Sequence, residues 1–217
     1  MENALGQNYK ELVLEKMKKL KYAPFGFTVQ KCKLSGAEFE IILLTADCAK
    51  NIDLMDLLGK WRKENEQWYL SQFPVSVERT TKWFMGKLTE VPDRLLFIIK
   101  VSSKFIGHVG LFRFDFDNLT CEIDNILRGE GNYPGIMAAS IKGMMAWAKS
   151  NLGLRGFTLK VLSDNPRAIK LYQKIGYREV TRIPLIQVDG QDGLEWIEAA
   201  QDYKGQAQRY YLVMSSC

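Results

Sequence analysis

The sequence predicts an α/β or α+β fold, in which helices cover both faces of a mixed, mostly antiparallel central sheet. Three consecutive segments of strand composition, residues 94–101, 104–114 and 120–128, are separated only by short turn-like stretches and indicate an antiparallel meander. After this meander, helical and strand patterns alternate along the chain. The expected order is strand, two helices, three strands, helix, strand, helix and two strands.

The elements before the meander follow from the spacing of apolar residues. Residues 11–20 carry apolar side chains at helical spacing with lysines opposite, which predicts a short amphipathic helix. Residues 38–45 form a β-branched and aromatic run and are expected to be a strand. Two helices are expected to follow, at residues 51–67 and from residue 76 or 77 to residue 88.

The elements after the meander have clear start and stop signals. Residues 134–150 are the clearest helix, with Pro134 in the first turn, where its missing N–H costs nothing. Residues 157–162 are expected to be a strand. A further helix begins at Asn165 and Pro166 and ends at Gly176. Residues 177–188 and 208–215 complete the expected sheet, joined by a polar stretch.

Composition sets limits on function. The chain has 217 residues, 47% hydrophobic, with 30 basic and 25 acidic side chains and a formal charge of +5. We expect a single domain over residues 1–217, with residues 1–37 as an N-terminal extension. The basic residues form no concentrated stripe, so nucleic acid is not an expected partner. Neither a secretory signal nor an apolar run of membrane-spanning length is evident, and we expect a cytoplasmic protein without membrane association.

Histidine and cysteine usage argues against a metal site. His108 is the single histidine, so a site built on two histidines is excluded, and any serine or cysteine triad would need His108 itself. The cysteines show no CxxC spacing and are expected to be ordinary thiols in a reducing compartment. These four residues are Cys32, Cys48, Cys121 and Cys217.

The stretch from residue 126 to residue 137 is the most informative part of the chain. Gly129, Gly131 and Gly135 lie between the end of a strand, near Arg128, and the start of the clearest helix. Glycines let backbone N–H groups turn inward, and a helix start favours an anion. The alternative is a loop that needs glycine only for positive φ angles.

A second motif follows about thirty residues later. The segment NPRAIKLYQKIGY contains Asn165, Ala168, Tyr172, Gly176 and Tyr177 at the spacing N-x-x-A-x-x-x-Y-x-x-x-G-[FY]. With this segment, the glycine loop and the GHVGL strand, the chain resembles the Gcn5-related N-acetyltransferase (GNAT) superfamily over nearly its whole length. The loop departs from the family pattern [QR]-x-x-G-x-[GA], because Tyr133 occupies the last small position. Gly135 is expected to take that role after a shifted helix start.

The resemblance implies an N-acyltransferase with acetyl-coenzyme A or another short-chain acyl-coenzyme A as cosubstrate and no metal. It implies that the pantetheine arm pairs with backbone at residues 125–127, with the amide of Leu127 or its neighbour facing the thioester carbonyl. Tyr172 would protonate the leaving sulfur, although a core aromatic is the alternative. The expected cofactor-binding residues are Ile126, Leu127, Arg128, Gly131, Asn132, Tyr133, Gly135, Ile136, Met137, Asn165 and Arg167.

Three residues are candidates for the base that deprotonates the amine. Strand alternation puts Glu122 and Asp124 on one face and Asn125 on the other. His108 is placed first, oriented by Asp124, because an unperturbed imidazole titrates near neutrality. A core histidine paired with a carboxylate is the alternative for His108, and loss of the proton to solvent is the alternative to any base.

The acceptor is expected to bind beside an aromatic and basic segment. Trp68, Tyr69 and Arg79 would contact it, together with Glu122 and Asn125, although core packing is the alternative for several aromatics. The meander also looks like a GNAT subgroup that acylates nucleotide-linked amino-deoxysugars for surface polysaccharides, which makes this small molecule the expected partner. A protein or small-molecule amine acetyltransferase and a non-catalytic acyl-coenzyme A-binding module are the rivals. A homodimer is compatible with each.

Overall fold

A computed structural model describes residues 4–190, 193–200 and 202–216 and shows one nine-stranded sheet with five α-helices. Cys217 lies outside the described residues. The elements up to the meander are α1 (Ala4–Lys21), β1 (Thr28–Leu34), β2 (Ala37–Leu43), η1 (Ala46–Lys50), α2 (Ile52–Glu64), η2 (Glu66–Trp68), α3 (Val77–Trp83), η3 (Phe84–Thr89), β3 (Leu95–Val101), β4 (Lys104–Asp115) and β5 (Thr120–Arg128). The later elements are α4 (Ile136–Leu152), β6 (Gly156–Leu162), α5 (Pro166–Lys174), β7 (Tyr177–Gly190), β8 (Gly193–Glu198) and β9 (Arg209–Ser216).

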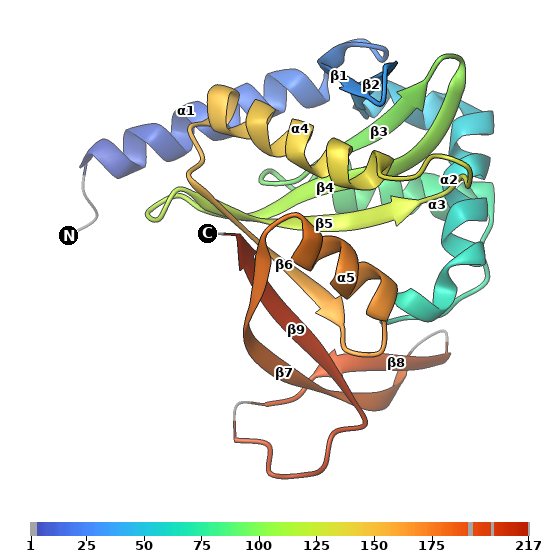
Figure 1. The fold of residues 1–217 in the computed structure, drawn as a ribbon, viewed down its shortest axis with the longest axis vertical. Helices are drawn as coiled ribbons and strands as arrows, with labels where there is room; N and C mark the ends of the chain where they lie inside the picture. The colour runs from blue at the N-terminus through green and yellow to red at the C-terminus, as the bar shows by residue number, and fades with distance from the viewer. Residues whose placement is uncertain (1–3, 191–192, 201, 217) are drawn as a thin grey trace.

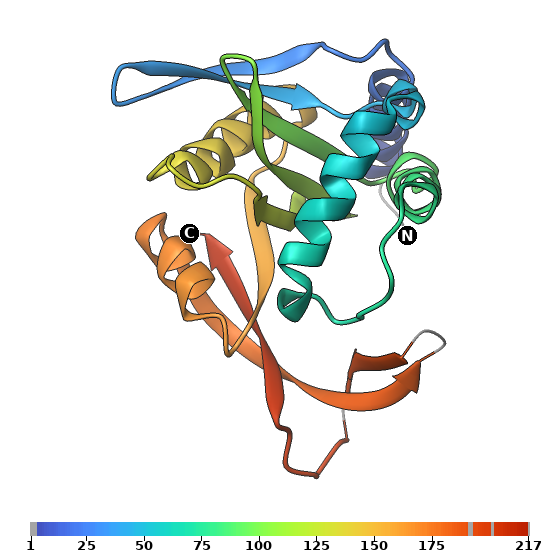
Figure 2. The same cartoon turned by 90° about the vertical axis from the view of Figure 1, so that its right-hand side faces the viewer.

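The strands lie in the order β1-β2-β3-β4-β5-β6-β9-β7-β8 (Figure 1). Neighbours pair in antiparallel fashion except β5 and β6, which are parallel. β9 lies between β6 and β7, so the C-terminal strand joins the hairpin β7–β8 to the rest of the sheet. Figure 2 shows that this last part of the sheet diverges from the part formed by β1 to β5.

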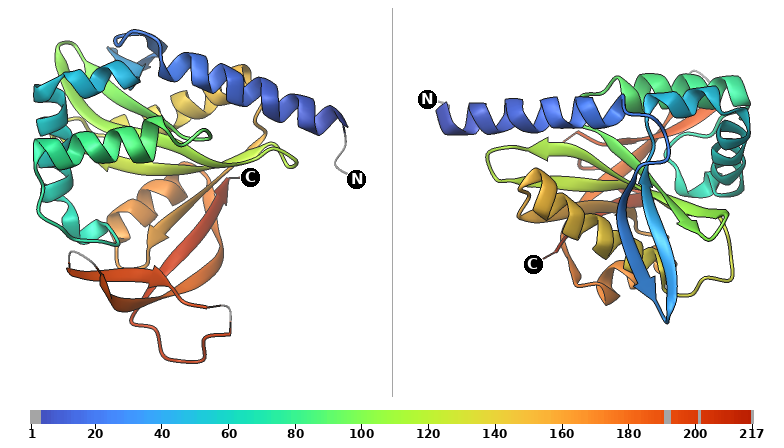
Figure 3. Two further views of the ribbon diagram at one scale, coloured as in Figure 1. Left: turned by 180° about the vertical axis from the view of Figure 1, so that it is seen from behind. Right: turned by 90° about the horizontal axis from the view of Figure 1, so that it is seen from above.

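Two cores lie on opposite faces of the sheet. On one face, α4 packs over the strands together with α5, and residues such as Phe97, Val109 and Ile141 are buried there. On the other face, α2 and α3 cover β2 to β4, with Trp61 and Phe84 in a second core (Figure 3). The two cores follow from period-2 alternation, because successive residues of a strand point to opposite faces.

The expected element order is confirmed, and the structure adds elements to it. β1 and β8 are strands that the sequence analysis did not predict, and α1 is longer than the expected helix 11–20. The expected helix at 76–88 changes after Trp83 into a wider π-helical segment. α1 is tied to the body by Lys21, whose ammonium donates to the carbonyls of Thr89, Val91 and Pro92.

The structure also bears on membrane and metal association. Among the described helices, none is long and apolar enough to cross a membrane. Within the described ranges, no group of three or more His, Cys, Asp or Glu side chains is arranged to hold a metal ion.

Candidate active site

The candidate site begins where β5 and β6 separate. The two strands pair from Thr120 and Gly156 up to Ile123 and Leu159. Beyond that point β5 continues to Arg128 and β6 to Leu162 without pairing to each other. The backbone of residues 124–128 on the β6 side is therefore free to bind an extended ligand, as an unpaired strand edge can.

A β-bulge changes the direction of β5 at this opening. On β4, His108 and Gly110 pair with Leu127 and Asp124 of β5, so β5 contains one extra residue between these pairs. Asn125 lies in the bulge with φ of 46°, a left-handed conformation that is uncommon for a residue other than glycine. The bulge resets the alternation, so Asn125 does not continue the face of Cys121 and Ile123 that the sequence analysis assigned to it.

The loop after β5 leads into the start of α4. Asn132 and Gly135 have φ of 60° and 82°, and Gly135 is the N-cap of α4, where no side chain caps the helix. The amides of Gly129 and Glu130 donate to the carbonyl of Ile106 on β4, at 2.9 Å each. The uncapped start of a 17-residue helix supplies N–H groups and a positive dipole end, which suits a pyrophosphate.

The other expected cofactor residues surround this opening. Leu127 is buried in the second core, while Ile126 and Tyr133 pack against the first core and Arg128 is half-buried. Gly131, Asn132 and Gly135 are exposed, whereas Ile136 and Met137 are buried beneath them. Asn165 caps α5 by accepting from the amide of Ala168 at 3.1 Å, and Arg167 is exposed in the first turn of α5.

Tyr172 lies on the buried side of α5. It is 5% exposed and makes an edge contact with Tyr177, with ring centroids 6.4 Å apart. Burial raises the pKa of the Tyr172 hydroxyl, so the group stays protonated throughout the physiological range. Its hydroxyl has no hydrogen-bond partner among the described residues, which suits a proton donor as well as a core aromatic.

The expected pairing of His108 with Asp124 is wrong. His108 Nδ1 lies 2.6 Å from the carbonyl of Asn125, and since a carbonyl only accepts, Nδ1 carries the proton. Asp124 instead forms an ion pair with Arg94 and accepts from Asn125 Nδ2 at 2.9 Å. The bulge is the reason, because it brings the Asn125 carbonyl to the imidazole.

Burial also changes the proton affinities of these two groups. It lowers the pKa of His108 to about 4, and it raises the pKa of Asp124 to about 6 against the opposing effect of Arg94. A neutral imidazole with a pKa near 4 is a weak base for an ammonium. His108 is therefore a poorer base than its ordinary pKa suggested.

His108 should make the free energy of unfolding depend on pH. Unfolded histidine binds a proton near pH 6.5 and the folded one only near pH 4, so acidification through this window favours unfolding. Asp124, with a raised pKa, acts in the opposite direction and partly cancels the effect in the wild type. The test is urea unfolding of both proteins at pH 7 and at pH 4.5. Between these two pH values, we expect the free energy of unfolding to decrease by about 2 to 3 kcal/mol less in His108→Gln than in the wild type. Equal losses in both proteins would contradict a buried neutral imidazole.

The aromatic segment before the meander forms a ladder with the chain's own arginines. The Arg62 guanidinium lies 4.0 Å from the Tyr69 ring centroid and 4.3 Å from that of Phe73, and Arg79 lies 4.2 Å from Phe73. The ladder borders a cavity of about 20 Å³ beside His108, enough for roughly one water. Arg62 already covers one face of the Tyr69 ring, so an acceptor cannot stack on that face as expected. Burial raises the Tyr69 pKa to about 12.

The segment carrying Trp68 is joined to the C-terminal hairpin. The Trp196 amide of β8 donates to the Leu70 carbonyl at 2.8 Å, and Arg209 donates to the Gln67 carbonyl at 2.9 Å. Trp68 is 38% exposed, so its ring can contact a ligand. The loop that follows α2 and η2 therefore lies beside β8 (Figure 2).

A group of polar residues that we call the polar floor lies on the face of β5, β6 and β9 beyond the second core. Its members are Glu122, Thr158, Lys160 and Tyr211, all half-buried. Glu122 pairs with Arg113 at 3.0 Å and Lys160 with Glu198 at 2.5 Å. Burial raises the pKa of Tyr211 to about 12, and both carboxylates add to this shift.

Lys160 and Tyr211 are site residues that were not predicted from the sequence. A lysine in the middle of the otherwise apolar segment FTLKVL was the available signal, since a central strand rarely holds a lone charge. Tyr211 carried no comparable signal.

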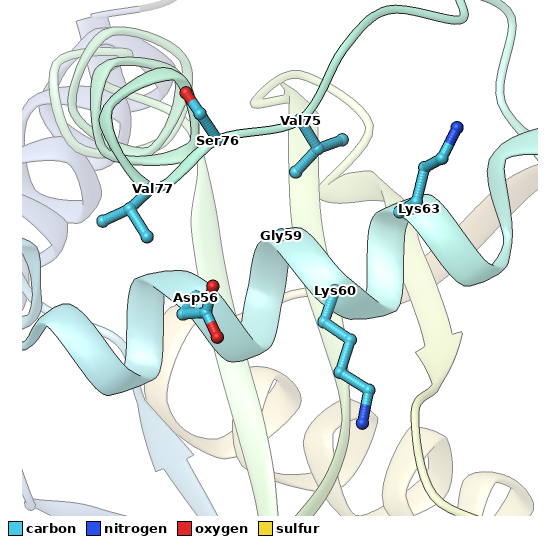
Figure 4. Close-up of a pocket in the computed structure, with 7 residues that line it drawn as sticks. All are labelled: Asp56, Gly59, Lys60, Lys63, Val75, Ser76 and Val77. Atoms are coloured by element: carbon cyan, nitrogen blue, oxygen red, sulfur yellow. The ribbon is translucent and has the colours of Figure 1, made fainter.

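A larger pocket of about 260 Å³ lies between α2 and the segment that leads into α3 (Figure 4). Its lining includes Gly59, Lys60, Lys63 and Val75, and none of its residues comes from β5, β6, α4 or α5. Lys60 pairs with Glu64 and Lys63 with Glu66, which neutralises the two cations. Gly59 and Val75 also line the smaller cavity beside His108, so the two spaces adjoin.

Two curated relatives match part of the chain. An uncharacterized protein of Methanocaldococcus jannaschii is 26% identical over 161 residues, covering 71% of this chain and 31% of that protein. An N-acetyltransferase 9-like protein of Caenorhabditis briggsae is 28% identical over 105 residues, covering 42% of this chain and 53% of that protein. The chain thus spans about a third to a half of the length of these relatives.

Solved acetyltransferases share the fold. A ribosomal L7/L12 alpha-N-protein acetyltransferase has a TM-score of 0.62 at 15% identity, covering 89% of this chain and 98% of that one. The microcin C7 self-immunity acetyltransferase, in complex with acetyl-CoA and AMP, has a TM-score of 0.60 at 15% identity, covering 91% of this chain and 98% of that one. The Vibrio cholerae spermidine N-acetyltransferase, in complex with CoA and spermine, has a TM-score of 0.59 at 16% identity, covering 82% of this chain and 94% of that one.

The family follows from a match that includes the sheet opening and the glycine loop. Residues 44–178 match the model of the acetyltransferase (GNAT) domain, which is more than half of the chain. This range runs from the end of β2 to the start of β7 and contains the β5 bulge, the uncapped start of α4 and Tyr172. The chain belongs to the GNAT family of N-acetyltransferases, whose acyl donor is a coenzyme A thioester.

Proposed function

We propose that the chain transfers an acetyl or other short acyl group from coenzyme A to the amine of a nucleotide-linked amino-deoxysugar. The charge balance of the polar floor is the observation that carries this acceptor class. Glu122 is matched by Arg113, and Lys160 is matched by Glu198. A polyamine needs an excess of carboxylates, whereas sugar hydroxyls both donate and accept and suit a surface of balanced charge.

The surroundings of the floor support a nucleotide. The exposed Trp68 ring offers a face for a base, and Arg209 lies 5.6 Å from the ring of Trp196. The microcin C7 enzyme, which shares the fold, is described in complex with AMP. These features favour a nucleotide-linked acceptor over a free amino sugar.

The donor would bind along the β5–β6 opening and the start of α4. A bound acyl-coenzyme A supplies the activated thioester. The amides of the loop at residues 131–137 would hold its pyrophosphate, with Arg128 and Arg167 adding positive charge. The backbone of Ile126 and Leu127 would orient the acyl group, and the amide of Leu127 or its neighbour would donate to the carbonyl oxygen as negative charge develops there.

Two side chains would handle protons. Tyr172 would give its proton to the departing thiolate sulfur. Of the three candidate bases, Glu122 lies on the polar floor and pairs with Arg113, whose side chain is 55% exposed. His108 is buried with a lowered pKa, and Asp124 is paired with Arg94, whose side chain is only 16% exposed. We therefore assign the acceptor amine's proton to Glu122, directly or through one water.

The proposal is tested with a panel of amines, acetyl-coenzyme A and mass-spectrometric detection. We expect kcat/KM for nucleotide-linked amino-deoxysugars to exceed that for the free amino sugars, spermidine and an N-terminal peptide at least tenfold. Glu122→Gln should lower kcat/KM and alter its acid limb, while Lys100→Met, which breaks a pair with Glu40 on β2, serves as control. Preference for spermidine or peptide would overturn the acceptor class, and coenzyme A binding without turnover of any amine would indicate a non-catalytic module.

A further inference from the structure

The bulge in β5 holds a strained residue that needs support. Asn125 has φ of 46°, and the pairing between β4 and β5 shifts by one residue around it. Asparagine tolerates this left-handed conformation better than most residues, yet the conformation persists only where neighbouring groups fix it. The adjacent backbone, at Ile126 and Leu127, is the part of β5 that faces the opening.

Two side chains form hydrogen bonds with Asn125, one with its backbone and one with its side chain. The Asn125 carbonyl accepts from His108 Nδ1 at 2.6 Å, and its side-chain amide donates to Asp124 Oδ2 at 2.9 Å. Two glycines of β4 leave room for β5 on either side of the bulge: a Cβ at Gly110 would overlap Asp124 Oδ1, and a Cβ at Gly107 would overlap the Leu127 carbonyl. Strand β4 is thus shaped around the bulge.

Arg94 fixes the carboxylate in this arrangement. Its Nη2 forms the ion pair with Asp124 Oδ2, its Nη1 donates to the Lys87 carbonyl at 3.2 Å, and its guanidinium lies 4.2 Å from the Phe112 ring centroid. The two side chains are only 16% and 11% exposed. Because every contact comes from a different element, the position of the Asp124 carboxylate is determined by the fold.

The pair is not arranged for maximal stability. Within the described chain, Arg94 Nε and Asp124 Oδ1 are buried without a hydrogen-bond partner, and each such group carries an uncompensated loss of hydration. A buried ion pair with unsatisfied atoms is weak evidence for stabilisation.

We propose that Arg94 is a positioning residue for acyl transfer, acting through Asp124 and Asn125 to hold the β5 bulge. Its contacts orient Asp124, Asp124 orients Asn125, and the bulge aims the following amides at the thioester carbonyl. The inference rests on the proposed placement of the thioester beside Ile126 and Leu127. The pyrophosphate site is a separate segment, the loop at residues 131–137, and does not depend on Arg94.

The test distinguishes an effect on binding of the acyl group from an effect on binding of the rest of the cofactor. In Arg94→Met and Asp124→Asn we expect kcat to fall at least tenfold. The affinity for coenzyme A, which lacks the acyl carbonyl, should stay within about twofold, while the preference for acetyl-coenzyme A over coenzyme A is lost. The double variant should lose no more than either single one, because both changes act on one network. Arg94→Lys keeps the cation and should recover part of the activity.

A measurement without substrate keeps this inference independent of the proposed function. Amide hydrogen exchange of the peptide 120–128 should accelerate at least tenfold in Arg94→Met and Asp124→Asn, and stay unchanged in the control Lys100→Met. If the wild type acylates no amine, the exchange rates and the affinities for coenzyme A and acetyl-coenzyme A still test whether Arg94 positions the bulge. Wild-type exchange and kcat in a folded Arg94→Met would overturn the inference, as would parallel loss of coenzyme A affinity. Should Arg94→Met fail to fold, Asp124→Asn faces the same criteria.

Discussion

Replacing Gly135 with aspartate is expected to weaken coenzyme A binding on the order of a hundredfold, measured by calorimetry. Gly135 is the N-cap of α4, with φ of 82°, and a Cβ there would contact only the Leu34 methyl groups at 3.8 Å, so the new carboxylate would stand at the proposed pyrophosphate site. Two like charges about 4 Å apart in a partly solvated site repel by a few kcal/mol, which corresponds to this loss.

Gly135→Asn is the matched control for that substitution. Asparagine has the shape of aspartate and tolerates the same left-handed backbone, but it carries no charge. We expect its affinity for coenzyme A to fall less than tenfold. Equal losses in the two variants would assign the effect to backbone strain, and unchanged affinity in Gly135→Asp would remove the pyrophosphate from this loop.

Tyr172→Phe should lower kcat by roughly tenfold to ten-thousandfold, the range typical of general acid–base groups. The change removes only the hydroxyl, and the ring keeps its edge contact with Tyr177, so the fold and the affinity for coenzyme A should be preserved. Steady-state rates with saturating acetyl-coenzyme A measure the effect. Because burial raises the hydroxyl pKa, Tyr172 should add no basic limb to the pH profile below about pH 10.

Tyr177→Phe provides the comparison, because Tyr177 is the neighbouring buried tyrosine and its hydroxyl contacts Met145 Sδ at 3.7 Å. It should retain near-wild-type kcat. Wild-type activity in Tyr172→Phe would return Tyr172 to the core, and similar losses in both variants would point to packing rather than proton donation.

Much of the fold was predictable because its strands and helices follow simple periods. The meander and the helix at α4 combine alternation, turn residues and an apolar stripe, all of which are local signals. β1 escaped prediction because its segment TVQKCKL mixes lysines with small apolar residues, and its neighbour β2 supplies most of the burial. β8 escaped because the segment GLEWIE is short and reads as part of a polar connection.

The site was less predictable because its geometry depends on one backbone irregularity. Strict alternation placed Asn125 opposite Asp124 and left His108 to pair with Asp124. A single inserted residue in β5 changed both contacts, and an asparagine with positive φ gives no sequence signal comparable to glycine. The role of Arg94 had no local signal either, because its partner Asp124 lies on β5, beyond the intervening strand β4. The acceptor face also depends on the bridge between Ser71, in the loop after η2, and Glu195 of β8, two residues far apart in the sequence.

The insertion of β9 between β6 and β7 has a consequence for how the chain reaches this structure. β1 to β5 pair largely as hairpins of sequence neighbours, whereas β9 must find β6 and β7 after the whole of β8 has intervened. Pairing over such separations closes large loops and slows folding. Until β9 enters, both flanking strands present open edges that can recruit other chains. Variants that weaken β9 should therefore aggregate during refolding while the β1–β5 half is already formed.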